Sequence, residues 1–311
     1  MYELNEMLEE YLITLKAEGK VDLTIKTRRK HLKPFFAYLY ATSGNDEKID
    51  LTDVTRRQIR EYITYMLDRD LSPVYLNNIL KSIRSIFRYM VDEGYLKEEF
   101  NPAPKVKALR EKRTLITTFT DKEIQALIDV YKRSNAFLPT RNKLIIMLFA
   151  DTGIRISELI KLKDCDFQGT SINILGKGNK QRVVFLSPLV AKQLAKFQRI
   201  KRQYFKHTGA VADEYLFVNF YGKRLTPEGV NKMLKRTAER TGRVFTIRVS
   251  CHTLRHYFSQ KYIENGDIYT LSRLLGHSNL ETTRTYLRSM SDDKVIEKGI
   301  QSSPMTSLGI R

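Results

Sequence analysis

The sequence predicts a mainly α-helical protein with a small β-sheet, in which a helical N-terminal domain precedes an α+β domain. Apolar residues recur every three to four positions along most of the chain, which is the spacing of one helix face. Two short β-rich runs flank a glycine-containing turn near residue 177. The chain has 311 residues, 42% of them hydrophobic, which is enough for two ordinary domains with their own cores.

The first hundred residues, 1–100, are predicted to form a domain of helices. Apolar residues from Leu4 to Leu12 share one helix face. Thr55 can cap a helix through its side-chain oxygen, and Pro73 suits a first helical position, where a missing N–H has no partner to lose. Breaks are expected after residue 42 and near Gly94. The predicted helices begin, in chain order, near Leu4, Thr24, Thr55 and Pro73.

Residues 101–114 are predicted to link two domains. The stretch contains two prolines and a run of basic residues, and it lacks an apolar period. If the two domains held a polyanion between them, the lysines and arginines of this stretch could follow its charges. A solvated, charged linker is the simpler interpretation, and the two are compatible.

A second domain is predicted over residues 115–297, followed by a tail, 298–311, without a long helical pattern. Thr120 is its first helix cap. Two β-rich runs, 171–175 and 183–186, are joined by a hairpin tip that reads G-K-G-N-K-Q, and Tyr215 to Val218 is a further short strand. Helices are expected at 121–133, 141–151, 157–161, 188–205, 226–240, 252–264 and 271–275, and from Ser278 or Asn279 through Tyr286.

Positive charge is concentrated in the second part of the chain. The formal net charge is +19. Residues 1–110 carry 19 lysines and arginines and 17 acidic residues, a net charge of +2. Residues 111–311 carry the remaining 35 lysines and arginines and 18 acidic residues, a net charge of +17. A field of that sign attracts polyanions and speeds their association. We therefore expect a nucleic-acid partner rather than a basic surface without a specific partner.

The sequence carries no feature typical of a membrane or secreted protein. The longest uncharged apolar run, from Leu144 to Ala150, is far too short to cross a bilayer. The N-terminus is acidic and amphipathic, unlike a signal peptide. Cys165 and Cys251 are the only cysteines and form no C-x-x-C pair, so a reducing, cytoplasmic location is expected.

A spaced set of basic residues ends at a tyrosine. Arg155 and Arg255 can hold the two non-bridging oxygens of a phosphodiester with their planar forks of donors. His252, three residues before Arg255, shares its helix face, and His277 can add a hydrogen bond. Lys177 at the hairpin tip can protonate a leaving 5′ oxygen. The segments are T-G-I-R-I-S-E-L (152–159), L-G-K-G-N-K-Q-R (175–182), H-T-L-R-H (252–256) and L-L-G-H-S-N-L-E-T-T-R-T-Y (274–286).

Tyr286 is the candidate nucleophile of this set. A free phenol titrates near about 10, so at neutral pH it needs a cationic surround or a nearby base. The cluster supplies both. Fixed guanidinium and imidazole groups can also neutralise the charge that Mg²⁺ would otherwise offset, so no metal and no other cofactor is expected.

Each of these residues also has an ordinary structural interpretation. Arg155 and Glu158 are spaced for a surface ion pair worth about 0.2–0.5 kcal/mol, and Tyr286 is one of 17 tyrosines. The histidines of H-T-L-R-H and the two cysteines indicate zinc only weakly, because no H-E-x-x-H occurs. Two aspartates beside Cys165 lack a third carboxylate for a metal nuclease, and G-K-G is not a P-loop. The four segments together favour phosphoryl transfer through a covalent intermediate.

With these segments the chain resembles the tyrosine recombinases, also called the phage integrase family, and most closely their two-domain Xer-like members. T-G-I-R-I-S-E-L resembles the family's first arginine box, and G-K-G-N-K-Q-R resembles the β-hairpin of the catalytic lysine. H-T-L-R-H resembles the H-x-x-R box, and the segment ending at Tyr286 resembles the final box with its nucleophile. The resemblance implies a SAM-like core-binding domain over residues 1–100 and a catalytic domain over 115–297.

The resemblance also implies roles at the phosphate. Arg155 and Arg255 would bind the scissile phosphate, and His277 would stabilise the transition state. Glu158 matches the acidic position of the first box, where the resemblance implies a supporting role.

Further roles implied by the resemblance concern proton transfer. Tyr286 would form a 3′-phosphotyrosyl link, and His252 would assist proton transfer at this nucleophile. Lys177 would be the general acid for the 5′ leaving group; Lys180 is a nearby alternative that the G-K-G context disfavours.

The implied activity is that of a site-specific recombinase or integrase, which cleaves and rejoins double-stranded DNA without metal or ATP. A homotetramer, or a mixed tetramer with a second recombinase, would hold two DNA sites and exchange strands through a Holliday junction. Two other functions use the same residues. A type IB topoisomerase-like enzyme would relax DNA without pairing two sites, and a DNA-binding regulator would carry the catalytic set without using it.

Overall fold

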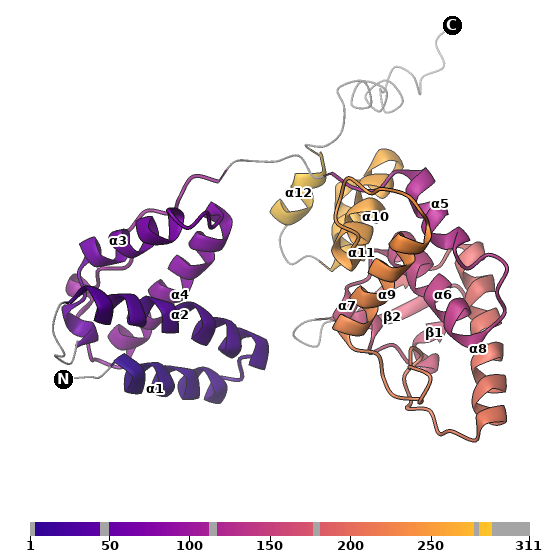
Figure 1. The fold of residues 1–311 in the computed structure, drawn as a ribbon, viewed down its shortest axis with the longest axis horizontal. Coiled ribbons are helices and arrows are strands. Elements are labelled where there is room, and N and C mark those ends of the chain that lie inside the picture. Colours follow the sequence, from indigo (N-terminus) through magenta and orange to yellow (C-terminus); the bar gives the residue numbers. More distant parts are fainter. Residues whose placement is uncertain (1–3, 44–49, 112–116, 177–180, 277–279, 288–311) are drawn as a thin grey trace, which may run out of the picture. The chain divides into compact units, whose positions relative to one another are not determined.

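The chain folds into two compact units, which comprise residues 1–113 and 114–311 (Figure 1). The computed structural model describes residues 4–43, 50–111, 117–176, 181–276 and 280–287. Some residues singled out in the sequence analysis lie outside these ranges, as does the predicted tail. They are Lys177, Lys180, His277, Ser278, Asn279 and residues 298–311. None of the described helices has the length and apolar character needed to cross a membrane.

The first unit is a helical bundle around one hydrophobic core (Figure 1). Tyr11, Phe35, Tyr62 and Phe87 are among its largest fully buried side chains. Each of its long helices therefore turns one apolar face inward, as the sequence period predicts. The helices are α1 (Leu4–Ala17), α2 (Asp22–Thr42), α3 (Arg56–Leu67) and α4 (Pro73–Asp92), with 3₁₀ turns at Leu51–Asp53 and Glu98–Phe100.

Local signals set the starts of α3 and α4. The Thr55 side chain accepts a hydrogen bond from the backbone of Gln58, whose own side chain reaches back to Thr55, so the two form a capping box. Ser72 caps α4, and Pro73 occupies its first turn as predicted. Helix α2 begins at Asp22, two residues before the predicted start, and Asp22 places negative charge in its first turn.

The first part of the predicted linker packs against the first unit. Ala103 and Val106 are buried in its core, at 0% and 4% exposure. Asn77 of α4 donates to the carbonyl oxygen of Leu109 (3.0 Å) and accepts from its backbone N–H (2.8 Å). The sequence of 101–111, with its prolines and basic residues, did not predict this packing, because the packing depends on a side chain from another helix.

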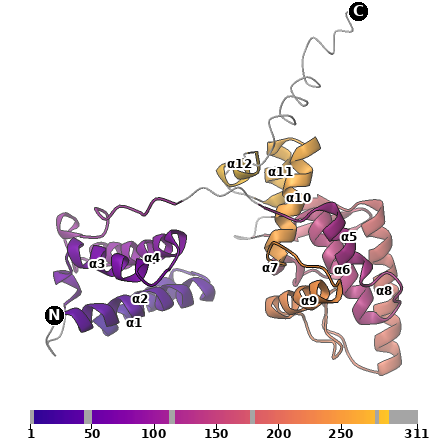
Figure 2. The same cartoon turned by 45° about the horizontal axis from the view of Figure 1, so that its top comes forward.

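The second unit is built of helices around a small sheet. Helix α6 (Phe137–Thr152) is buried along most of its length, and α5, α8 and α10 pack on it (Figure 2). The predicted helix at 121–133 is shorter in the structure and ends at Asp129. The other helices are α5 (Asp121–Asp129), α7 (Ile156–Leu159), α8 (Pro188–Thr208), α9 (Pro227–Arg240), α10 (Cys251–Asn265), α11 (Ile268–Leu275) and α12 (Glu281–Leu287), with a 3₁₀ turn at Asp164–Asp166.

The sheet is antiparallel, with strand order β1-β2-β3. Strand β2 (Ser171–Leu175) pairs with β3 (Gln181–Phe185) in a register that places Ile174 opposite Arg182. Strand β1 (Phe167–Gln168) was not predicted, because two residues are too few for a period to show. The strand predicted from Tyr215 to Val218 is present only as isolated bridges, in which Tyr215 pairs with Lys163.

Candidate active site

Arg155 stands at a sharp bend between two helices. Helix α6 ends at Thr152 and is followed by its C-cap Gly153, which adopts φ +60°, and Arg155 then caps α7. The Glu158 carboxylate accepts hydrogen bonds from the Arg155 backbone N–H (2.9 Å) and from Arg155 Nη1 (3.0 Å). The predicted pair therefore exists, but Glu158 is only 6% exposed, so this is not the surface ion pair of the ordinary interpretation.

Arg255 reaches the same region from α10. Its guanidinium donates to the carbonyl oxygens of Gly153 (2.5 Å, from Nη1) and Leu275 (2.8 Å, from Nη2). Arg155 Nη2 donates to the carbonyl oxygen of Gly276, the next residue after Leu275 (3.0 Å). Two guanidinium groups that are far apart in sequence thus meet at the C-terminal end of α11.

Arg255 remains cationic in this environment. Arg255 is buried, and burial together with the nearby charge of Arg155 lowers its pKa to about 10. That value is still far above neutral pH. A buried guanidinium that keeps its charge can meet a phosphate at full strength, because little water screens the contact.

Tyr286 lies inside the second unit. Helix α12 packs against α10 and α11, and the three lie side by side in both views (Figures 1 and 2). The Tyr286 side chain is 4% exposed. Burial raises the pKa of its phenol, while a hydrogen bond from Ser259 and the positive charge of Arg255 act in the opposite direction. The hydroxyl is therefore protonated at neutral pH.

One partner of the Tyr286 hydroxyl is His256, with 2.8 Å between Nδ1 and the phenol oxygen. Burial, assisted by His252 and Arg255, lowers the pKa of His256 to about 4, so the ring is neutral at pH 7. With its proton on Nε2, the ring accepts the phenol's hydrogen through Nδ1. The resemblance implies that His252 assists proton transfer at the nucleophile, and the structure adds a contact between the hydroxyl and the nearby His256.

His252 lies next to this pair. Its ring centroid is 4.1 Å from that of His256, with the rings at 72°. It is more exposed than His256, and burial and the charge of Arg255 lower its pKa as well. The i,i+4 spacing of the two histidines in H-T-L-R-H was the sequence signal that they share a face.

Arg182 of β3 is a further residue of the site that sequence reasoning left without a role. Its guanidinium forms two parallel hydrogen bonds with Glu158, Nη1 to Oε1 (2.8 Å) and Nη2 to Oε2 (2.7 Å). Burial alone would raise the pKa of Glu158, but Arg182 and Arg155 outweigh it and the pKa is lowered. Glu158 is therefore an ionised carboxylate shared by two arginines.

Two predicted members of the set, Lys177 and His277, lie outside the described residues. Their chain neighbours do not. Leu175 and Gln181, which bracket the lysine segment, are paired across β2 and β3. Gly276, directly before His277, carries the carbonyl that accepts from Arg155.

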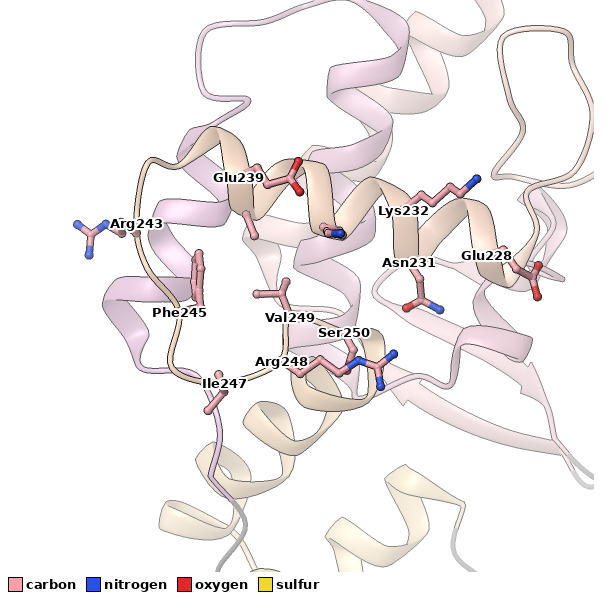
Figure 3. A pocket seen from close by; sticks show the side chains of 12 residues that line it. Glu228, Asn231, Lys232, Glu239, Arg243, Phe245, Ile247, Arg248, Val249 and Ser250 are labelled. Atoms are coloured by element: carbon pink, nitrogen blue, oxygen red, sulfur yellow. The ribbon is translucent and has the colours of Figure 1, made fainter. Parts of the chain in front are cut away.

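A groove of about 700 Å³ lies between α9 and the segment that leads into α10 (Figure 3). Phe245 and Val249 extend from this segment toward α9. Lysines and arginines of the groove are accompanied by two glutamates, so its charge is mixed. None of the predicted catalytic residues that the structure describes lines it. The groove ends at Ser250, the N-cap of α10, and so adjoins the helix that carries Arg255.

The described residues offer the zinc interpretation no ligand set. Among them, no group of three or more His, Cys, Asp and Glu side chains is placed to hold a metal ion. Cys165 is exposed, and Cys251 is buried with its Sγ 3.5 Å from Asn231 Oδ1. Burial raises the pKa of the Cys251 thiol to about 12, which disfavours the thiolate that a metal requires.

Family models match both units of the chain. Residues 117–292 match the phage integrase family, and residues 3–108 match the phage integrase SAM-like domain. The first match alone covers more than half of the chain. The matched segments fall within the two compact units, residues 1–113 and 114–311.

Relatives match over nearly the whole chain. The tyrosine recombinase XerD of Staphylococcus epidermidis is 30% identical over 291 residues, covering 91% of this chain and 94% of the relative. The tyrosine recombinase XerC of Pediococcus pentosaceus is 28% identical over 287 residues, covering 91% and 92%.

Solved structures share the fold. XerH bound to a palindromic difH substrate, a post-cleavage complex, matches with a TM-score of 0.72 and 22% identity over 92% of this chain and 81% of that one. A lambda integrase tetramer bound to a Holliday junction matches with a TM-score of 0.70 and 17% identity over 94% and 78%. Family models, relatives and fold agree: the chain belongs to the phage integrase family and is a tyrosine recombinase, an enzyme of site-specific DNA cleavage and rejoining.

Proposed function

We propose that Tyr286 is the nucleophile of this recombinase and forms a 3′-phosphotyrosyl link with the DNA. The observation that supports the proposal is the convergence of three segments. Arg155 and Arg255 both donate to carbonyl oxygens at the end of α11, and the charge of Arg255 acts on the Tyr286 phenol. Two cations for a phosphate thus meet at the end of α11, and one of them, Arg255, is close enough for its charge to act on the hydroxyl that would attack the phosphate.

In the proposed step, the Tyr286 oxygen attacks the phosphorus while the bond from phosphorus to the 5′ oxygen breaks. The phenol proton passes to a histidine, for which His256 has the contact, with His252 beside it. Lys177 protonates the departing 5′ oxygen, and His277 donates to the phosphate. Rejoining is the reverse reaction, with a 5′ hydroxyl of the partner strand as the nucleophile.

The arginines change partners when the phosphate binds. In the free protein they donate to neutral carbonyl oxygens of Gly153, Leu275 and Gly276. A phosphate oxygen is a charged acceptor and makes hydrogen bonds roughly twice as strong. The exchange therefore favours the DNA complex, and the benefit grows as charge develops in the transition state.

The energy of the broken bond is kept in the phosphotyrosyl link, so the proposed reaction needs no ATP. The guanidinium and imidazole groups are suited to offset the charge that a metal ion would otherwise neutralise. We therefore expect cleavage in the presence of EDTA.

We further propose that residues 1–100 are the core-binding domain and 115–297 the catalytic domain, and that the protein acts on DNA in the cytoplasm. The net charge of +17 over residues 111–311 supports binding to duplex recombination sites. The lambda integrase of similar fold is a tetramer on a Holliday junction, which supports a tetramer here, formed by four copies or with a second recombinase.

The test is covalent trapping. Purified protein is mixed, in EDTA, with nicked duplex fragments from the flanks of its own gene and run on a denaturing gel. We expect a slowly migrating band with the wild type and none with Tyr286→Phe, which removes only the hydroxyl. A band that persists with Tyr286→Phe, or one that needs Mg²⁺, would contradict the proposal.

A further inference from the structure

We propose that Arg182 is a positioning residue that sets Arg155 for phosphate binding by fixing the Glu158 carboxylate and the turn at the end of α11. The inference rests on the proposed function, because it assigns Arg182 to the phosphate-binding side of that reaction. Arg182 itself does not touch the substrate in this proposal. It acts through Glu158 and through the Leu274–Gly276 turn.

Each of the three guanidinium nitrogens of Arg182 donates a hydrogen bond within the protein. Nη1 and Nη2 hold the two Glu158 oxygens, and Nε donates to the carbonyl oxygen of Leu274 (2.7 Å). The side chain is 10% exposed and that of Glu158 is 5% exposed. One group thus joins strand β3, helix α7 and the end of α11, with little water to weaken the contacts.

Both elements that Arg182 holds are the partners of Arg155. Glu158 accepts from the Arg155 backbone and from its Nη1, and Gly276 accepts from its Nη2. Arg155 must exchange Gly276 for a phosphate oxygen while Glu158 keeps the other side of its guanidinium in place. The position of Glu158, and therefore Arg182, decides where that guanidinium can turn.

The turn at Gly276 is shaped around Arg182. Gly276 adopts φ +62°, and a Cβ built on it would lie 3.1 Å from both Cδ and Nη1 of Arg182. A larger residue would crowd the guanidinium and strain the backbone at once. The close approach shows that the Arg182 side chain and this turn are packed as a unit.

Lysine cannot reproduce this arrangement. A guanidinium offers a rigid planar fork that holds both carboxylate oxygens and still has a donor for a third acceptor, whereas an ammonium is a point charge. With lysine at 182, Glu158 would keep a cation but lose its fixed orientation. Arg182→Lys therefore keeps the positive charge beside Glu158 and removes only the fixed hydrogen-bond geometry.

Two substrate modifications distinguish the phosphate side of the reaction from the leaving-group side. A methylphosphonate at the scissile position replaces one non-bridging oxygen with a methyl group, so the charge that the arginines neutralise is absent. A 5′-phosphorothiolate replaces the leaving oxygen with sulfur, which departs without being protonated. The methylphosphonate should therefore rescue variants that bind the phosphate charge poorly. The 5′-phosphorothiolate should rescue variants that lack the general acid.

The experiment measures single-turnover cleavage of nicked DNA carrying each of the three linkages. The proteins are the wild type, Arg182→Lys, Arg182→Gln, Arg155→Gln and Lys177→Ala, each at saturating DNA. With the ordinary phosphodiester, we expect Arg182→Gln to cleave roughly 10²-fold more slowly than the wild type, the scale of loss from a small misplacement. With the methylphosphonate, the Arg182 and Arg155 variants should both recover toward the wild-type rate.

If only the phosphorothiolate rescued the Arg182 variants, they would behave as Lys177→Ala is expected to. Arg182 would then act on the leaving-group side, and the inference would be overturned. The inference would also be overturned if the Arg182 variants cleaved the ordinary phosphodiester at the wild-type rate. Failure of the wild type on all three substrates would instead contradict the proposed function.

Arg141→Gln is the matched control for a buried cation. Arg141 is 7% exposed and donates to the carbonyl oxygen of Val218 (2.7 Å), much as Arg182 donates to Leu274. It lies 12 residues before Gly153 on α6, about 18 Å along the helix axis at 1.5 Å per residue. We expect this variant to melt at lower temperature but to cleave all three substrates like the wild type.

Melting curves accompany every variant. If Arg182→Gln does not fold, Arg182→Lys carries the test, because it keeps the positive charge beside Glu158. A slow Arg182→Lys enzyme that the methylphosphonate rescues supports the inference. If neither modified linkage rescues Arg182→Lys, and its melting temperature falls as that of Arg141→Gln does, the role of Arg182 is structural only. That result would overturn the inference.

Discussion

The two units of the molecule bury different kinds of polar side chain. In the described part of the first unit, the buried polar side chains are His31, Asn77, Ser82 and Asn101, and none is an Asp, Glu, Lys or Arg. In the described part of the second unit, the buried charged residues are Arg141, Glu158, Lys201 and Arg255. Burying an ion is costly unless partners satisfy it. The second unit carries that cost, and two of the four ions lie at the candidate site.

One pair of contacts shows what the difference means. His31 Nδ1 lies 2.7 Å from Ser82 Oγ in the first unit, and His256 Nδ1 lies 2.8 Å from the Tyr286 hydroxyl in the second. Burial lowers the pKa of both histidines. Each hydroxyl also has an arginine near it: Arg28 donates to Ser82 Oγ in the first unit, and the charge of Arg255 acts on the Tyr286 phenol in the second. Only Arg255 lies close to a second predicted phosphate ligand, Arg155, whose charge lowers its pKa. The first contact should matter for stability and the second for catalysis.

After the loss of the nucleophile itself, the largest effect is expected from the buried cation at the site. Arg255→Gln removes donors that would face the developing charge, so single-turnover cleavage should fall by roughly 10²–10³-fold, as for the loss of one preorganised donor. Lys201→Met is the comparison, because Lys201 is a buried cation that donates to the Tyr215 carbonyl (2.7 Å). It should lower the melting temperature and leave the cleavage rate of the bound enzyme unchanged. Equal losses in both variants would show that burial, not position, explains the effect.

A smaller effect is expected at the nucleophile's partner. His256→Phe removes the acceptor of the phenol hydrogen, and cleavage should slow by roughly 10²-fold, the lower end of acid–base contributions. His256→Asn places an amide oxygen near the position of Nδ1 and should recover much of the rate. The measurement is the rate of covalent complex formation at saturating DNA. If both variants cleave alike, the contact serves packing.

The same histidine predicts a pH dependence of stability. The pKa of His256 is about 4 in the folded protein against an ordinary value of 6.5. The unfolded chain therefore binds the proton more readily, and the stability present above pH 6.5 is lost as the pH falls toward 4. Urea titrations between these values should show a steeper decline in the wild type than in His256→Asn. Parallel declines would mean that His256 is not the group involved.

The smallest effect is expected in the first unit. Ser82→Ala removes the hydroxyl shared by His31 and by Arg28 Nη1 (2.9 Å). The free energy of unfolding should fall by about 1 kcal/mol, as for one lost hydrogen bond. Cleavage by the bound enzyme should be unchanged. A slower covalent step in this variant would break the division of roles between the two units.

Features set by neighbours in sequence were the predictable ones. Thr55 and Thr120 cap helices and Pro73 opens one, because each signal depends on residues three or four positions away. The short helix predicted at 157–161 is present as α7, with Arg155 at its N-cap. The helical class, the small sheet and the recombinase family were also confirmed.

Contacts between distant segments could not be predicted. His256 meets Tyr286 across 30 positions, and Arg182 meets Glu158 across 24. No period or spacing connects such pairs, and His252 was an equally good choice beside the nucleophile. The anchoring of residues 101–111 depends on Asn77 in the same way.

The measurement that tests the central claim most directly identifies the residue joined to DNA. The covalent complex is digested with nuclease and trypsin, and mass spectrometry locates the nucleotide that remains. Cleavage after Arg284 leaves the peptide of residues 285–288, in which Tyr286 is the only tyrosine. We expect a 3′-linked nucleotide on this peptide. A nucleotide on another residue, or a link through the 5′ phosphate, would contradict the account.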